Sequence, residues 1–314
     1  MGCATTPQVA SPAAARFAPS SGKTLVIIGQ DRDAIDPYVQ ATGSVPAGVM
    51  LYTSIQELNG LDQPIDYGGG PQDAQALLRK YPHSALQIGL WMVGALDAVA
   101  QGRLDDHIRR LGAWIAATKR PVYLRVGYEC DYPANNYEPQ AYILAFRHVV
   151  ERLRTQRVDN VAYVWHSFAD QATRPAIAWY PGDDYVDWVA VSYFDPDQQP
   201  YLEGVAEIAR AHRKPLMIAE STPRVLGTRF GERSWDAWFV PYFRFVWERD
   251  VQAISYINWD WETIPMFRGQ GWEDARIQAN EVMKAHWIQE MRDPRYLHAS
   301  PTLFWRLGLS ETAK

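Results

Sequence analysis

The chain has 314 residues, 47% of them hydrophobic, which is enough apolar material for the core of a large domain. Its formal net charge is -5 and it has no long basic run, so nucleic-acid binding has no electrostatic support. Its two cysteines, Cys3 and Cys130, stand far apart in the sequence and exclude a disulfide framework and a cysteine-based zinc site.

Residues 1–22 are rich in Ala, Pro, Ser and Thr and have no periodic apolar pattern. This composition predicts a flexible linker in front of a folded domain over residues 23–314. Within the linker, Gly2-Cys3-Ala4 resembles the processing site of a bacterial lipoprotein, where the cysteine carries the lipid. The same residues also match an N-myristoylation pattern, and an accidental cysteine is a third interpretation. The lipoprotein interpretation predicts a protein of the bacterial envelope, or a secreted one, that meets the membrane only through a lipid on Cys3.

Beyond the linker, eight β-rich runs alternate with longer stretches of helical periodicity, which is typical of βα units and a parallel sheet. The predicted strands are, in chain order, residues 24–29, 49–52, 85–91, 122–126, 161–165, 186–193, 216–219 and 253–259. Two of the predicted helices span 104–118 and 140–154, and Pro139 is well placed to start the second. Eight such units predict an α/β fold, a (β/α)8 TIM barrel in a single domain. The main alternative is an open doubly wound sheet, but the sequence has no glycine-rich phosphate loop after the first predicted strand.

Two glutamates stand at the ends of the fourth and seventh predicted strands. Glu129 ends the run Pro-Val-Tyr-Leu-Arg-Val-Gly-Tyr-Glu, and Glu220 ends Lys-Pro-Leu-Met-Ile-Ala-Glu. In a parallel barrel the carboxyl ends of the strands face one cleft, and catalytic groups come from several of them. Two facing carboxyl groups are the minimum equipment for cleaving a glycosidic bond. The alternative for either glutamate alone is a solvated residue or a helix cap.

Several neighbours are expected to support this pair. Arg125 lies four residues before Glu129, which on a strand is the same face of the pleat, and it could hold the Glu220 carboxylate ionised. Tyr193, at the end of the sixth strand, is expected to donate its hydroxyl to Glu220. Other candidates for the cleft, for sugar binding or for helix capping stand at or just past strand ends; they are Trp91, Asp131, Trp165 and His166.

The 13 tryptophans and 17 tyrosines suit stacking on sugar rings, although most rings of any protein fill its core. The aspartates at 31, 33 and 36 lack the glycine and the terminal glutamate of a calcium loop, and we expect neither a metal nor a cofactor.

Three blocks of the sequence resemble glycoside hydrolase family 26, the family of β-mannanases and some β-1,3-xylanases. They lie at 125–129, 179–193 and 214–220, and the likeness as a whole covers roughly residues 80–262. The resemblance implies a retaining, double-displacement mechanism with Glu129 as acid/base and Glu220 as nucleophile. It also implies that Trp259 forms the floor of the sugar site. Tyr128 departs from the family, which has histidine immediately before the acid/base.

The sequence therefore predicts a retaining β-glycosidase, endo-acting on a polysaccharide or oligosaccharide and monomeric. A non-catalytic glycan-binding protein on a degenerate barrel is the alternative from another class, and the intact pair of glutamates argues against it. A hydrolase with a serine nucleophile is a third alternative, because Ser192 and Ser221 lie near strand ends, but no Gly-x-Ser-x-Gly turn is present.

Overall fold

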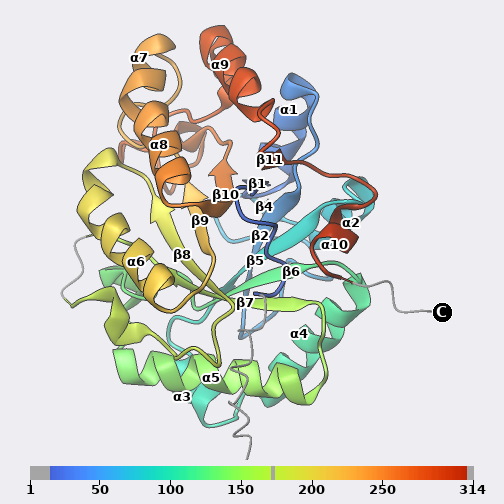
Figure 1. Ribbon diagram of the computed structural model, residues 1–314. Coiled ribbons are helices and arrows are strands. Elements are labelled where there is room, and N and C mark those ends of the chain that lie inside the picture. Colours follow the sequence, from blue (N-terminus) through green and yellow to red (C-terminus); the bar gives the residue numbers. More distant parts are fainter. Residues whose placement is uncertain (1–14, 171–173, 310–314) are drawn as a thin grey trace, which may run out of the picture.

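Eight parallel strands form a closed barrel in the computed structural model, which describes residues 15–170 and 174–309 (Figure 1). The barrel strands are β1 (Thr24–Gly29), β2 (Gly48–Ser54), β5 (Ala85–Trp91), β6 (Val122–Val126), β7 (Val161–Ser167), β8 (Trp188–Tyr193), β9 (Leu216–Ser221) and β10 (Val251–Ile257). Each pairs with the next in this order, and β1 pairs with β10 from Leu25–Ala253 to Gly29–Ile257, which closes the barrel. The predicted (β/α)8 fold is confirmed.

Helices connect the strands and surround the barrel on its outside (Figure 1). They are α1 (Arg32–Thr42), α2 (Ala74–Lys80), α3 (Leu96–Ala100), α4 (Asp105–Thr118), α5 (Pro139–Thr155), α6 (Gln199–Ala211), α7 (Glu232–Ser234), α8 (Val240–Glu248), α9 (Glu281–Met291) and α10 (Leu303–Arg306). Short elements complete the fold; they are β3 (Ile65–Asp66), β4 (Pro71–Gln72), β11 (Tyr296–Leu297), η1 (Pro133–Asn135), η2 (Ala176–Trp179), η3 (Pro196–Gln198), η4 (Trp235–Phe239), η5 (Trp261–Thr263) and η6 (Ile277–Ala279).

Helix α5 shows how local sequence sets these elements. It begins at Pro139, as predicted, since proline has no backbone N–H to leave unsatisfied in the first turn. The side chain of Glu138 caps it by accepting hydrogen bonds from the backbone N–H groups of Gln140 (2.8 Å) and Ala141 (3.2 Å). Its apolar side, which includes Phe146, is buried against the barrel.

The folded domain begins before residue 23. Phe17 is only 6% exposed and packs edge-on against Tyr123, whose hydroxyl donates to the Phe17 carbonyl (2.8 Å). Trp188 Nε1 donates to the Arg16 carbonyl over 2.8 Å. Because both donors come from the barrel interior near the amino ends of β6 and β8, residues 15–22 cover that end of the barrel. The predicted linker boundary at residue 22 is therefore too late, and Phe17 is the apolar residue that the composition argument overlooked.

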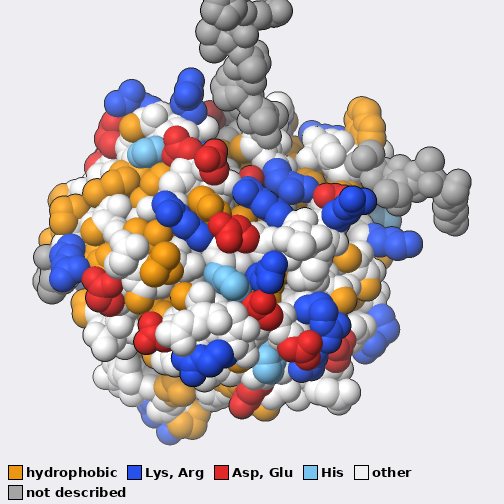
Figure 2. All heavy atoms as spheres, turned by 90° about the horizontal axis from the view of Figure 1, so that it is seen from below, with side chains coloured by type: hydrophobic (Ala, Val, Ile, Leu, Met, Phe, Trp, Pro, Cys, Tyr) orange, Lys and Arg blue, Asp and Glu red, His pale blue; other side chains and the backbone are white. Residues whose placement is uncertain are grey.

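The prediction of a lipid on Cys3 lies outside the described residues. In the part of the chain that the structure describes, no helix combines the length and the apolar composition needed to span a bilayer. On the face shown in Figure 2, Lys and Arg side chains are interspersed with Asp and Glu, and no large area carries a single sign of charge.

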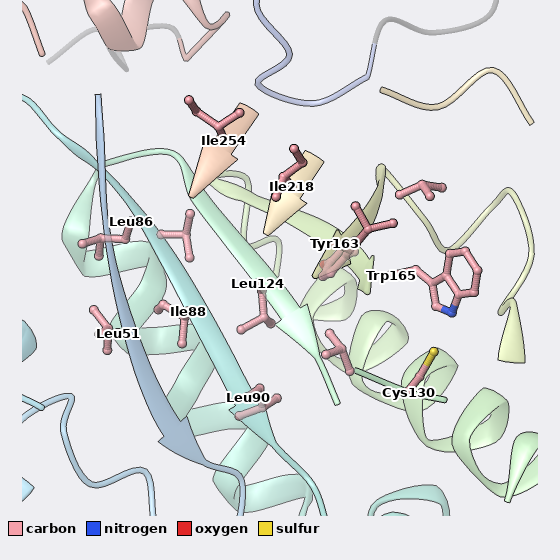
Figure 3. Packing of buried hydrophobic residues seen from close by; sticks show 14 of the residues in the cluster. Leu51, Leu86, Ile88, Leu90, Leu124, Cys130, Tyr163, Trp165, Ile218 and Ile254 are labelled. Atoms are coloured by element: carbon pink, nitrogen blue, oxygen red, sulfur yellow. The ribbon is translucent and has the colours of Figure 1, made fainter. Parts of the chain in front are cut away.

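The hydrophobic core has two layers. The larger layer lies between the strands and the surrounding helices, and Figure 3 shows part of it, including Leu51, Ile88 and Leu124. The smaller layer fills the barrel itself and includes Met50 and Met217. Both faces of each strand are therefore buried, as is usual for a parallel sheet covered by helices. Because both faces of each strand are apolar, the sequence does not show which of its residues point into the barrel.

Candidate active site

Glu129 lies on a turn beyond β6 and not in the strand. The strand ends at Val126, and both Gly127 (φ 56°) and Glu129 (φ 51°) have left-handed backbone conformations. A Cβ atom on Gly127 would lie 2.9 Å from the Tyr142 ring, so only glycine fits there. A glutamate in this conformation costs about 1 kcal/mol, and such strain is common at functional sites. Arg125 and Glu129 therefore do not share one face of a strand, contrary to the prediction, although both side chains reach the same site.

Glu220 is buried at the end of β9 and forms an ion pair with Arg125 of β6. The Arg125 guanidinium donates through Nη1 to Glu220 Oε1, and Arg125 is fully buried while Glu220 is 7% exposed. A register shift between β8 and β9 pairs Ser192 directly with Glu220, and such irregularities re-aim side chains. The contact between Arg125 and Glu220 that the sequence predicted is present.

Arg125 is held from several sides. Its guanidinium lies 5.0 Å from the ring centroids of both Tyr52 and Tyr128, and Nη2 lies 3.4 Å from Met50 Sδ. Burial lowers the pKa of Arg125, but the charge of Glu220 and the proximity of Tyr52 outweigh it and raise that pKa above its ordinary value. The guanidinium is therefore a fixed positive charge beside Glu220 at every working pH.

A buried hydrogen-bonded chain continues from Arg125 to Glu129. Arg125 Nη1 lies 3.5 Å from His166 Nδ1, and His166 Nε2 lies 3.1 Å from Ser192 Oγ. The Ser192 hydroxyl in turn donates to Glu129 Oε1 over 2.6 Å. Burial, and then the charge of Arg125, lower the pKa of His166 well below its ordinary value, so the imidazole is neutral. His166 was expected to line the cleft; its side chain faces the barrel interior and is fully buried.

Glu129 and Glu220 have different electrostatic environments. Burial, and then the negative charge of Glu220, raise the pKa of Glu129 to about 8, against the smaller opposing effects of the Ser192 hydrogen bond and Arg125. Glu129 is thus protonated at neutral pH, whereas Glu220 is paired with a permanent cation. One carboxyl group can donate a proton while its neighbour offers a carboxylate.

Three aromatic rings extend from the ion pair toward the surface. Tyr128 lies 5.3 Å from Tyr52 and 5.9 Å from Trp91 between ring centroids, and Trp91 is 38% exposed. The structure therefore brings together Trp91 and Tyr128, two of the residues that were expected at the site. Sequence reasoning missed Tyr52, although it is the last residue of the second predicted strand.

Trp165 was expected to line the cleft and Tyr193 to donate its hydroxyl to Glu220, and both predictions are wrong. Trp165 is fully buried on the helix side of β7, near Cys130 and 5.1 Å from the Tyr180 ring (Figure 3). The Tyr193 ring packs against Tyr242 of α8 at 5.0 Å, and its hydroxyl has no hydrogen-bond partner among the described residues. Successive residues of a strand point to opposite faces, and His166 and Ser192 occupy the inward positions next to them.

Asp131 joins the turn after β6 to the end of β7. Its carboxylate accepts hydrogen bonds from Ser167 Oγ and from the Phe168 backbone N–H, each over 2.6 Å, and burial raises its pKa. Neither oxygen caps a helix. Trp259 lies beyond β10 with 6% exposure, its ring 5.1 Å from that of Trp261. Its expected role under the sugar stays a prediction.

A cavity of about 280 Å³ opens beyond the carboxyl ends of β7, β8 and β9. Its lining combines aromatic and charged side chains; among them are Phe168, Phe194, Asp195, Tyr201 and Arg224. Gln198, which is 3% exposed, stabilises the wall of this cavity. Its side chain accepts a hydrogen bond from the Phe194 N–H (2.7 Å) and donates one to the Phe168 carbonyl (3.3 Å). Within residues 15–170 and 174–309, no three His, Cys, Asp or Glu side chains are grouped so that they could hold a metal ion.

Comparison with known proteins gives consistent matches. The model of "Glycosyl hydrolase family 26" matches residues 123–225. A protein of Vibrio sp described as "Beta-1,3-xylanase TXYA" is 35% identical over 93% of this chain and 70% of its own length. A beta-1,3-xylanase of Alcaligenes sp is 34% identical over 93% of this chain and 68% of its own length.

Solved structures share the fold at lower identity. A family 26 β-mannanase from Bacteroides ovatus superposes with a TM-score of 0.65 at 15% identity, over 90% of this chain and 93% of its own. An endo-β-1,4-mannanase from Cellulomonas fimi gives a TM-score of 0.62 at 16% identity, over 90% of this chain and 74% of its own.

Proposed function

The chain belongs to glycosyl hydrolase family 26 and is a glycoside hydrolase, and we propose from this premise that it is an endo-acting, retaining β-glycosidase. In this proposal Glu129 is the acid/base and Glu220 is the nucleophile. The observation that carries it is the contrast between the two carboxyl groups. Glu129 has a pKa raised to about 8, while Glu220 is bound by Arg125 inside the same site.

The first step forms a covalent glycosyl-enzyme. Glu129 donates its proton to the leaving glycosidic oxygen, and Glu220 attacks the anomeric carbon. Arg125 binds Oε1 of Glu220, so Oε2 is the oxygen left for the attack. The bond between the anomeric carbon and the leaving oxygen breaks as the new ester bond forms.

The second step uses the electrostatic coupling between the two groups. Once Glu220 is esterified it carries no charge, and the second-largest cause of the raised pKa of Glu129 is gone. Glu129 is then a carboxylate at neutral pH and accepts a proton from the incoming water. Water attacks the anomeric carbon, Glu220 leaves, and Glu129 regains its proton.

We propose β-1,3-xylan as the first substrate to test, because the proteins described as β-1,3-xylanases match 93% of this chain. The exposed ring of Trp91 and the cavity lined by Phe168 and Tyr201 offer aromatic surface on both sides of the barrel end, which suits a long glycan chain. Such a polymer does not cross membranes, which supports an enzyme outside the cytoplasm. We therefore also propose a bacterial envelope or secreted location, with Cys3 as the lipid-bearing residue. Labelling with a radioactive fatty acid, lost in Cys3→Ser, tests this.

The test of the catalytic proposal is reducing-end release from β-1,3-xylan, β-1,4-xylan, β-mannan and mixed-linkage glucan. Glu129→Gln and Glu220→Gln are expected to lose at least about 10³-fold in turnover on the substrate that the wild type cleaves. Glu262→Gln, at a half-buried glutamate beyond β10, is the matched control and should keep the wild-type turnover.

Proton NMR of the first products checks the stereochemistry, which should be retained. Inverted products, or an active Glu220→Gln variant, would overturn the proposal. Size-exclusion chromatography with light scattering tests the expected monomer.

A further inference from the structure

The hydrogen-bonded chain between the two carboxyl groups has a fixed direction, and we infer that His166 and Ser192 are positioning residues that decide which oxygen of Glu129 carries the catalytic proton. The inference rests on the proposed role of Glu129 as acid/base. It concerns two residues that never need to touch the substrate.

The direction follows from which groups can donate. A guanidinium has only donors, so His166 Nδ1, 3.5 Å from Arg125 Nη1, must accept. A neutral imidazole whose Nδ1 accepts carries its hydrogen on Nε2, which then donates to Ser192 Oγ over 3.1 Å. The Ser192 hydroxyl hydrogen is left for Glu129 Oε1, 2.6 Å away.

Burial protects this order. Arg125, His166 and Ser192 are all fully buried, so bulk water does not compete for their hydrogen bonds. Reversing the link from Arg125 to His166 or the link from His166 to Ser192 would place two donors against each other, and reversing the link from Ser192 to Glu129 would take the acceptor away from the Ser192 hydroxyl hydrogen; each change leaves a buried group unsatisfied. The positive charge of Arg125 also keeps His166 neutral, which preserves its single donor.

Glu129 receives a donor on Oε1 and must carry its own proton on Oε2. A carboxylic acid can hold its proton on either oxygen, and only one of them can face the leaving group. The chain thereby removes the unproductive arrangement. The hydrogen bond from Ser192 also favours the ionised form of Glu129, against burial, and so eases release of the proton.

The same direction excludes Ser192 as a nucleophile. A catalytic serine gives its hydroxyl proton to a histidine that is oriented by an acid. Here the serine donates to the acid. His166 Nδ1, the nitrogen that an acid orients in a triad, contacts Arg125 instead. The residue types of a catalytic triad are present in Ser192, His166 and Glu129, but their hydrogen bonds connect them in a different order.

Several titratable groups surround Glu129, and their charges also affect its pKa. Those that face it are Glu220 on β9, Arg125 on β6, Asp131, Tyr128 and Tyr137 beyond β6, and His166 on β7 through Ser192. A substitution of Ser192 removes the hydrogen bond and leaves these charges in place. A change in the titration of Glu129 can then be assigned to that bond.

The experiment is a pH titration of Glu129 by carbon-13 NMR in protein labelled at glutamate side-chain carboxyls, with Glu129→Gln identifying the resonance. Ser192→Ala should raise the pKa of Glu129 by about one unit, since a charge-assisted hydrogen bond is lost. Ser221→Ala is the matched control. It removes a neighbouring buried serine whose hydroxyl donates to the Ser255 carbonyl (2.8 Å), and it should leave the titration unchanged.

Two conservative variants separate positioning from packing. Ser192→Thr keeps the hydroxyl and should keep the wild-type titration. His166→Leu should shift it as Ser192→Ala does, while His166→Gln, whose amide can both accept and donate, should restore it. On β-1,3-xylan, Ser192→Ala should lower turnover about tenfold and move the alkaline limb of the pH profile upward by the same unit.

An unchanged Glu129 titration in folded Ser192→Ala would overturn the inference, whether or not the enzyme cleaves β-1,3-xylan. Equal shifts in Ser192→Ala and Ser221→Ala would also overturn it, since they would reveal a general loosening of the barrel end. Full activity of Glu129→Gln would instead refute the proposed function and leave the NMR result standing.

Discussion

Removing Arg125 should expose how much the fold depends on the buried ion pair. In Arg125→Met a similar volume is kept, but Glu220 is left in the barrel, 7% exposed, without its cation. Breaking one side of a buried pair costs about 3–5 kcal/mol. The contacts of the guanidinium with the rings of Tyr52 and Tyr128 are lost as well. At about 2 °C per kcal/mol for a chain of this size, the melting temperature should fall by about 6–10 °C.

Urea unfolding at pH 7 of Arg125→Met, Glu220→Gln and the double variant measures this energy as a double-mutant cycle. The double variant removes both charges and should be more stable than Arg125→Met, with a coupling of at least about 2 kcal/mol. Arg109→Met is the control, because the Arg109–Asp106 pair (2.9 Å) is exposed and should change the midpoint little. Additive single effects in the cycle would refute the view that Arg125 acts by compensating Glu220.

Three further predictions follow from the site and its surroundings. Because burial and Glu220 raise the pKa of Glu129 from 4.5 to about 8, the folded chain holds a proton that the unfolded chain releases between these values, and stability falls as the pH rises through them. Glu129→Gln should therefore be more stable than the wild type at pH 8, by on the order of 2–4 kcal/mol, and this gain in stability should shrink toward pH 5. Thermal unfolding at both pH values measures the gain, and an equal gain at pH 5 and pH 8 would contradict the prediction. Tyr193→Phe removes a buried hydroxyl that has no hydrogen-bond partner among the described residues, so unfolding free energy should change by less than about 1 kcal/mol and turnover should be kept; a large fall in kcat would place the ring in the cleft after all. Gly70→Ala should cost about 2–4 kcal/mol, because φ is 96° and the new Cβ would lie 1.9 Å from Asp31 Oδ2, whereas Gly94→Ala (φ 73°, open space) should cost about 1 kcal/mol in the same chemical melts.

Much of the candidate site could be read from local sequence. The runs that became β1, β5 and β6 have the predicted bounds, because a strand buried on both faces is a short apolar run that ends where polar residues, glycine or proline begin. Because the carboxyl ends of such strands meet at one end of a barrel, the sequence could assign Glu129 and Glu220 to one site, although it did not predict the left-handed turn that carries Glu129. Each of these inferences uses a signal that lies within a few residues.

The orientation of the flanking side chains was decided by the tertiary structure. With both strand faces apolar, hydropathy does not tell inward from outward residues, and Trp165 and Tyr193 were assigned to the wrong face while His166 and Ser192 hold the inward positions. Pairing between separate strands sets the register shift that faces Ser192 with Glu220. The amino-acid sequence by itself thus determined the barrel and its two carboxyl groups, through periodicity and strand ends. Only the closed fold decided the hydrogen-bonded chain between them, because each of its links joins residues at least 26 positions apart.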